Sequence, residues 1–269
     1  MAYVASIHIY PIKSLDGIAV SQATLLPSGA LKGDRSFAIY DEQGEFVNCQ
    51  RHNGAYFLRL SFNISNNIVG LKIQGTEQEI FFHIDRERTR IQSWLTSYFG
   101  FRVKLVEDLL TGFPENPAAP GPTIISTETI AEIASWFPRV CVNEMRQHLR
   151  ANIEIGDVPP FWEDQLFAEN EEIVRLQIGT TLFQALNPSQ RSILSPPNYL
   201  REEVYPNFQK VFTAKRNKTL ADSARRLPLN HLSQLNINTR VPDGLSGKIL
   251  HIGDEVKIIN LKSSVDLDF

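Results

Sequence analysis

The first predicted strand lies in the stretch YVASIHIYPIKS (residues 3–14), an apolar run rich in β-branched residues that Pro11 stops. Similar short runs follow over the next hundred residues, separated by turn signals such as Pro27-Ser28-Gly29 and Gly75. They lie at residues 20–26, 37–40, 57–64, 68–73, 80–84 and 103–106. Apolar side chains recur at helical spacing over residues 90–99, and Gly100 ends that segment. The sequence pattern of the first 110 residues therefore predicts a series of strands and one helix.

The second part of the chain predicts two helices and a further set of strands. One helix begins at Ser126 as its N-cap and ends near 136–138, and a short one follows at 143–148. Strand-like runs lie at residues 152–155, 173–178, 183–186, 192–194, 234–238 and 248–259. Residues 199–227 are mixed and polar, with a helical alternative. The prediction is a β-rich α+β fold in two lobes. The domains would be 1–112 and 123–269, joined by the proline-rich crossover 113–122.

Composition excludes several classes of protein. The chain has 269 residues, of which 42% are hydrophobic, and a net charge of −3. That charge provides no bulk positive field for nucleic acid or an anionic membrane, but it leaves room for an anionic small molecule. The two cysteines, Cys49 and Cys141, are too few for a disulfide framework or a cysteine-based zinc site. No signal peptide or apolar run of membrane-spanning length is present, so the expected location is the cytoplasm.

Three short segments place cations or amides at the predicted ends of strands. They are YPIKS at residues 10–14, KGDR at 32–35 and RANI at 150–153. If these ends converge, Lys13, Ser14, Arg35, Arg150 and Asn152 would form a cradle for an anion, because arginine offers a forked donor and lysine a point charge. Taken singly, each is more simply a solvated or paired surface residue. The six histidines show no metal-binding spacing.

Together and in this order, these segments resemble the MOSC-domain family, named after the C-terminal domain of molybdenum cofactor sulfurases. The resemblance covers nearly the whole chain and includes the family's N-terminal β-barrel domain. The motifs on which the resemblance rests are YPIKS at 10–14, G-x-x-x-GDR at 29–35, Gln50-Arg51, RANI at 150–153, FWED at 161–164, LQIG at 176–179 and GKILHIGDEV at 247–256. The family includes the mitochondrial amidoxime-reducing components and bacterial relatives. The resemblance implies an N-terminal β-barrel-like domain followed by a MOSC β-barrel.

The resemblance also implies a molybdenum–pterin cofactor between the two lobes. Lys13, Ser14 and Arg35 match positions that hold its phosphate and pterin, and Arg150 and Asn152 match further cofactor contacts. The implied activity is an oxidoreductase that reduces N-oxygenated small molecules. Its electrons would come from a separate donor protein, because the chain contains no C-x₄-C-x₂-C cluster motif.

The chain departs from the family at the metal. The family's C-x-R-C segment corresponds to Ser189-Gln190-Arg191-Ser192, so Ser192 stands where a cysteine ligates molybdenum and Arg191 is kept. A serine hydroxyl must be ionised by the metal to bind it, and would give a harder site than a thiolate.

Three interpretations of this departure stay open. Ser192 ligates the metal and Arg191 stabilises negative charge beside it in an oxidoreductase. Alternatively, the cofactor is bound for carriage without a protein ligand. In the third, the fold serves metal-independent chemistry on an anionic small molecule, or binding alone. Cys49 is a candidate substitute thiol, although a small strand residue is the simpler interpretation, and Cys141, between two valines, is expected in the core.

Overall fold

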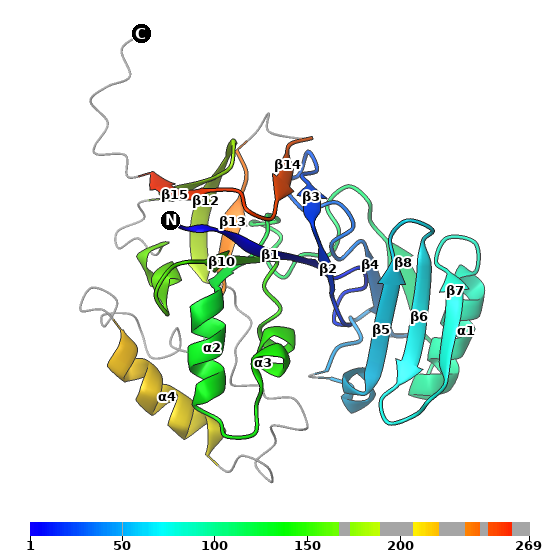
Figure 1. Cartoon of the computed structure of the whole chain (residues 1–269). Helices are drawn as coiled ribbons and strands as arrows, with labels where there is room; N and C mark the ends of the chain where they lie inside the picture. Colours follow the sequence, from blue (N-terminus) through cyan, green and yellow to red (C-terminus); the bar gives the residue numbers. More distant parts are fainter. Residues whose placement is uncertain (50, 167–172, 189–206, 221–234, 243–246, 260–269) are drawn as a thin grey trace.

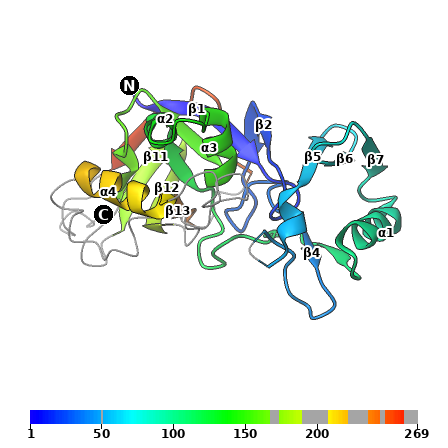
Figure 2. The same cartoon turned by 90° about the horizontal axis from the view of Figure 1, so that it is seen from below.

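The computed structural model describes residues 1–49, 51–166, 173–188, 207–220, 235–242 and 247–259. They form two lobes that lie side by side (Figure 1). The larger lobe contains a sheet with three helices below it, and the smaller lobe contains short sheets and one helix. The view from below separates the lobes again, with β7 and α1 at the outer edge of the smaller lobe (Figure 2). Within these ranges, no helix has both the length and the apolar character needed to cross a membrane.

The larger lobe is organised around an eight-stranded sheet of order β15-β11-β12-β13-β9-β10-β1-β2. The strands are β1 (Tyr3–Ile9), β2 (Ile18–Val20), β9 (Ile124–Ser126), β10 (Ile153–Gly156), β11 (Val174–Ile178), β12 (Thr181–Pro188), β13 (Ile237–Arg240) and β15 (Val256–Ile259). Neighbours are antiparallel except β9 and β10, which are parallel. The first strand of the chain therefore lies inside the sheet of the second half, where β1 pairs with β10.

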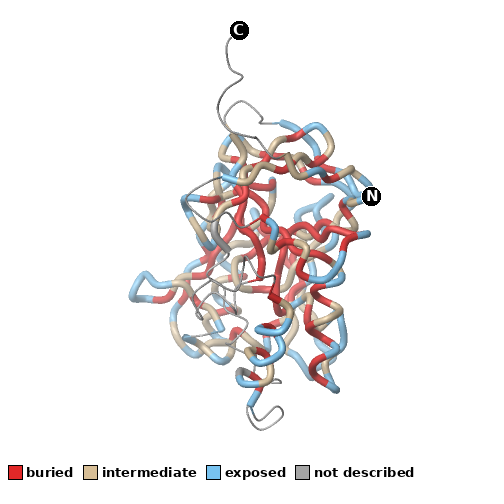
Figure 3. Tube along the Cα trace, turned by 90° about the vertical axis from the view of Figure 1, so that its left-hand side faces the viewer, coloured by how far each residue is buried: buried red, intermediate tan, exposed pale blue. Residues whose placement is uncertain are grey.

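The two ends of this sheet approach each other, although its strand order is open. Tyr3 forms an isolated bridge with Glu255, and the Val4 N–H donates to the Asp254 carbonyl at 2.9 Å. Nearby, β3 (Gln22–Thr24) pairs with β14 (Ile249–His251). The sheet thus curls round a core that includes Ile7, Ile124 and Phe183 (buried residues are red in Figure 3). β1 and the residues just before β15 therefore hold each other in place.

The smaller lobe consists of a meander, a two-stranded sheet and a helix. The meander is β5 (Leu58–Asn63), β6 (Ile68–Ile73) and β7 (Glu79–His83), and β4 (Phe37–Tyr40) pairs with β8 (Lys104–Glu107). Helix α1 (Arg88–Phe99) buries Ile91 and Leu95 in the core of this lobe. It ends at Gly100, whose φ of 76° is the left-handed conformation that glycine tolerates.

The helices of the larger lobe are α2 (Thr127–Ser135), α3 (Val142–Leu149) and α4 (Phe208–Thr219). A short 3₁₀ helix, η2 (Trp162–Leu166), packs beside them. Ser126 caps α2, accepting a hydrogen bond from the Thr129 N–H at 3.0 Å. A separate apolar cluster, which includes Ile130, Ile133 and Phe212, fills the space among the helices.

The predicted β-rich α+β class is confirmed, and most predicted elements are found within two residues of their expected ends. Strand β9 was missed, and the helical alternative for part of 199–227 is realised in α4. The expectation for Cys141 was wrong, because this residue is exposed and caps α3. The strand predicted at 192–194 lies outside the described residues. The division into domains at 113–122 stays a prediction.

Candidate functional site

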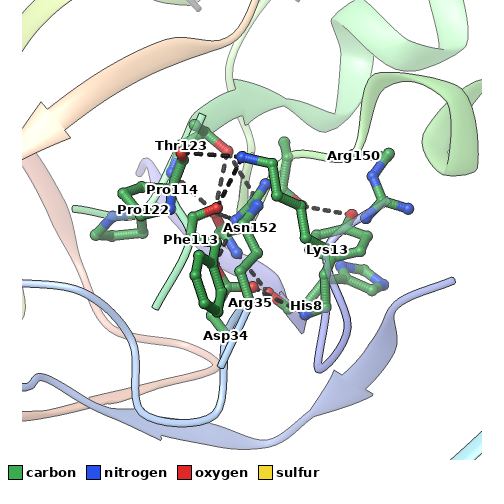
Figure 4. A network of polar contacts seen from close by, with 12 residues as sticks. His8, Lys13, Asp34, Arg35, Phe113, Pro114, Pro122, Thr123, Arg150 and Asn152 are labelled. Carbon is green, nitrogen blue, oxygen red and sulfur yellow. Dashed lines mark hydrogen bonds and ion pairs between the residues drawn. The ribbon is translucent and has the colours of Figure 1, made fainter. Parts of the chain in front are cut away.

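The three cations of the predicted cradle come from three different parts of the chain. Lys13 follows β1, Arg35 precedes β4, and Arg150 is the C-cap of α3. Figure 4 shows them in one polar network together with Asn152 and Thr123. The guanidinium carbons of Arg35 and Arg150 lie 5.2 and 4.2 Å from the centre of the Tyr10 ring. Tyr10 therefore holds two like charges close together.

Three of the five predicted cradle residues adopt a left-handed backbone. The φ angles of Ser14, Arg35 and Arg150 are 72°, 48° and 54°. Residues with a Cβ atom lose roughly 1–3 kcal/mol in this conformation and keep it only where the surrounding structure imposes it. Such strained residues gather at ligand-binding sites, so the backbone independently draws attention to this place.

Arg35 is a paired cation. Its Nη1 donates to the Asp34 carboxylate and, at 3.2 Å, to Oδ1 of Asn152. Burial by itself would lower the pKa of Arg35, but the negative charges of Asp34 and Glu115 outweigh it and the pKa is raised. Most of the charge on Arg35 is therefore balanced within the protein.

Asn152 holds this arrangement together. Its Oδ1 also accepts hydrogen bonds from the Thr123 N–H and Oγ1, both at 3.1 Å, while its Nδ2 donates to the His8 carbonyl at 3.0 Å. The side chain is 1% exposed. Its hydrogen bonds are all made inside the protein, and through them Asn152 joins Arg35 to Thr123 and to the backbone of β1.

Lys13 bonds to the crossover that joins the predicted domains. Its Nζ donates to the carbonyls of Phe113 and Pro114 at 3.0 and 3.1 Å, and it lies 4.6 Å from the centre of the Phe46 ring. The Phe113 N–H in turn donates to the Arg35 carbonyl at 2.9 Å. Lys13 and Arg35 are therefore linked through the backbone of the crossover.

Arg150 differs from the other two cations. It is 6% exposed, and its Nη1 donates to the Leu15 carbonyl. Its Nε and Nη2 are buried, and neither has a hydrogen-bond partner within the described residues. Burial lowers the pKa of Arg150, and the like charge of Arg35 lowers it further. Leaving donors of a charged group unpaired inside a protein costs more than the roughly 1–3 kcal/mol of a neutral group.

Arg150 lines two adjoining cavities. The larger cavity, of about 380 Å³, is also lined by His8, Tyr10 and Arg146, and lies beside β1 and α3. The smaller cavity, of about 60 Å³, is also lined by Ser14, Cys49, Arg59 and His148. Asp16 and Gln147 line both cavities, so the two are neighbours. The larger volume falls in the range of ordinary small-molecule sites.

The smaller cavity lies between the lobes. Tyr56 and Arg59 reach it from the smaller lobe, and His148 and Arg150 from the end of α3. Its one described acid is Asp16, whose oxygens accept from Arg59 Nη1 at 2.9 Å and from the Leu60 N–H at 3.0 Å. Because Asp16 pairs with Arg59, the remaining positive charge at this cavity comes from Arg150.

The sequence did not single out Tyr10, Arg59 or His148 as candidates, although all three lie at this site. Tyr10 belongs to the quoted YPIKS motif, and its hydroxyl donates to the Ala151 carbonyl at 3.0 Å. Arg59 and His148 carried no spacing signal, because they approach the cavity only through the packing of the lobes.

The predicted catalytic and metal-binding residues, Arg191 and Ser192, lie outside the described residues. The described part of the chain contains no group of three or more histidine, cysteine, aspartate or glutamate side chains that could hold a metal ion. The cofactor-binding assignments of Lys13, Ser14, Arg35, Arg150 and Asn152 stay predictions.

Comparisons with known proteins bear on the family. Residues 1–112 match the family described as the MOSC N-terminal beta barrel domain. No curated protein matches the chain. Among solved structures, the crystal structure of the YUAD protein from Bacillus subtilis is similar, with 14% sequence identity and a TM-score of 0.39. The match covers 95% of this chain and 93% of that one.

Proposed function

Because the chain belongs to the MOSC-domain family through its residues 1–112, we propose that it binds a molybdenum–pterin cofactor in the two cavities beside Arg150. When bound, such a group supplies a redox-active metal on an anionic organic carrier. The main observation behind this proposal is the buried guanidinium of Arg150, two of whose nitrogens have no hydrogen-bond partner among the described residues.

The donors of this site suit an anionic ligand rather than a bare metal ion. Guanidinium groups bind phosphate and planar oxygen or nitrogen acceptors through a fixed fork of N–H donors. An acceptor at Nε or Nη2 of Arg150 would satisfy donors that the described protein leaves unpaired. Ser14 also lines the smaller cavity, and Lys13 belongs to the same polar network as Arg150 (Figure 4).

The proposed reaction class is the reduction of an N-oxygenated small molecule, with electrons from a separate donor protein. In this scheme Arg191 stabilises negative charge near the metal, and Ser192 stands at the position of the family's cysteine ligand. Carriage of the cofactor without catalysis, and metal-independent chemistry on another anion, are the alternatives that the experiment below separates.

The test is to produce the protein in cells that make the cofactor, and to measure molybdenum by mass spectrometry and pterin by fluorescence. Arg150→Met should retain about 10- to 100-fold less pterin, because a hydrogen bond to a charged group contributes about 1.5–3 kcal/mol. The variant should fold, since methionine keeps an apolar stem over Tyr10 and the substitution removes a buried charge.

Arg240→Met is the matched control. Arg240 is exposed, bonds to Gln184 and lines neither cavity, so its pterin content should equal that of the wild type. If the protein contains the cofactor and reduces an N-hydroxylated substrate when an electron donor is supplied, it is a reductase. If it contains the cofactor but does not reduce the substrate, carriage of the cofactor is supported. Wild-type protein that contains neither molybdenum nor pterin would refute the proposal.

A further inference from the structure

Cys49 lies on the smaller cavity and not within a strand. It occupies a turn between Val47 and the 3₁₀ helix η1 (Asn53–Tyr56), and its side chain is exposed. It lines the smaller cavity together with Ser14 and Arg150. The sequence-based interpretation as a small strand residue is therefore wrong, and Cys49 lines the same cavity as Arg150.

The surroundings of Cys49 suit a thiolate that meets a ligand. Arg59, Arg150 and His148 line the same cavity, and the guanidinium of Arg150 would balance the negative charge of a metal-bound thiolate. Arg150 supplies a second and independent sign of a ligand, because it is 6% exposed with two buried nitrogens that lack a partner within the described chain. Cys49 and a buried arginine with unpaired N–H donors thus line the same small cavity.

We propose that Cys49 is the thiol that this chain presents to its cofactor, and that Cys49, rather than the Ser192 hydroxyl, ligates the metal. The inference rests on the proposed function, because it requires the cofactor to be bound. On ligation, the thiol gives its proton to water and a sulfur lone pair forms the bond to the metal, with no change of oxidation state. A thiol ionises far more readily than a serine hydroxyl, and the thiolate is the form that binds a metal.

Cys141 provides a matched internal control. It is also an exposed cysteine, but it caps α3, where its Sγ accepts from the Glu144 N–H at 3.5 Å. It lines neither of the two cavities. Any effect that follows from the loss of a thiol as such should therefore appear equally in Cys141→Ser.

The experiment compares Cys49→Ser, Cys141→Ser and Ser192→Ala, each produced in cofactor-making cells. X-ray absorption at the molybdenum edge counts the sulfur neighbours, and mass spectrometry gives molybdenum per pterin after gel filtration. Cys49→Ser should lose one sulfur neighbour and at least about tenfold in molybdenum retention, since even changes around a metal's ligands cost roughly 10- to 100-fold in affinity. The other two variants should keep the wild-type sulfur count.

A second measurement needs no variant. Iodoacetamide labelling followed by peptide mass spectrometry should modify Cys141 in both the empty and the loaded protein, and Cys49 only in the empty protein. Equal labelling of Cys49 in both forms, or an unchanged sulfur count in Cys49→Ser, would overturn the thiol assignment and leave cofactor binding intact. The absence of pterin from every sample would instead refute the proposed function itself.

Discussion

Glu163 is a buried acid whose environment makes the stability of the fold depend on pH. The side chain is 1% exposed and lies in η2, against the start of α2. Its Oε2 accepts from the Ser126 N–H at 3.2 Å and from the Thr129 hydroxyl at 3.0 Å. Its Oε1 is buried and has no partner within the described residues. Burial raises the pKa of Glu163 from its ordinary value of 4.5 to about 7, and the neighbouring charge of Asp164 adds to the rise.

The direction of the effect follows from which state holds the proton. Between pH 4.5 and 7 the folded chain keeps a proton on Glu163 that the unfolded chain has released, so the free energy of unfolding falls as pH rises. Below pH 4.5 both states are protonated, and above pH 7 both are ionised and the full cost of the buried charge is present. A difference of about 2.5 pKa units corresponds to about 3 kcal/mol, because one unit is about 1.4 kcal/mol.

Glu163→Gln keeps the shape of the side chain and removes this titration. We expect the variant and the wild type to be about equally stable near pH 4.5, and the variant to be more stable by up to about 3 kcal/mol at pH 8. Urea denaturation followed by tryptophan fluorescence at several pH values measures the difference. Glu128→Gln, at an exposed position in the first turn of α2, is the control. A stability difference between Glu163→Gln and the wild type that stays constant from pH 5 to 8 would refute the reasoning.

Three further substitutions test the packing. Arg216→Met leaves the carboxylate of Asp164 buried without its bidentate partner, and should cost about 3–5 kcal/mol in urea denaturation. Gly112→Ala would bring a methyl group within 2.7 Å of the Asp34 carbonyl oxygen at a φ of +71°, and calorimetry should show a loss of roughly 1–3 kcal/mol. Tyr10→Phe removes the 3.0 Å bond from the ring hydroxyl to a backbone carbonyl, and should lower the free energy of unfolding by about 1 kcal/mol.

Local signals predicted the elements well because strand and helix boundaries depend on short stretches of sequence. Residues 37–40 and 68–73 are strands with the predicted ends, and Ser126 caps its helix. The membership of β1 in the sheet of the second half was not accessible, because no local pattern encodes a partner in the other half of the chain. β9 was missed because three residues that run directly into a helix give no period to detect.

Cys141 shows how a local pattern can mislead. Its two valine neighbours favoured the core, but Cys141 and Glu144 form a capping box at the start of α3. The pattern resembles the serine or threonine followed three residues later by glutamate that marks helix starts. Cys141 is exposed at this N-cap, so the capping signal, not the apolar flanks, was the informative one.

At the candidate site, residue types predicted which side chains gather, but not what each one does there. Lys13, Arg35 and Asn152 have partners supplied by residues far away in the sequence, including Phe113 and Thr123. Whether a cation is paired depends on the packing of both lobes, and the sequence does not record it. The cavity position of Cys49 has the same origin, since the other residues that line it come from both lobes.

The contrast between Arg35 and Arg150 explains why one of them is the better candidate for a ligand contact. Both are buried beside Tyr10 in a left-handed backbone conformation, but Asp34 balances the charge of Arg35 directly. Burial and Arg35 both lower the pKa of Arg150, so this cation is held at a cost to the folded chain. A fold tolerates an unbalanced buried charge where another interaction stabilises it. An anion beside Arg150 would provide both the countercharge and the missing hydrogen-bond acceptors. The same anion would also lie next to Cys49, which joins the electrostatic argument for the cofactor to the proposal for its ligand.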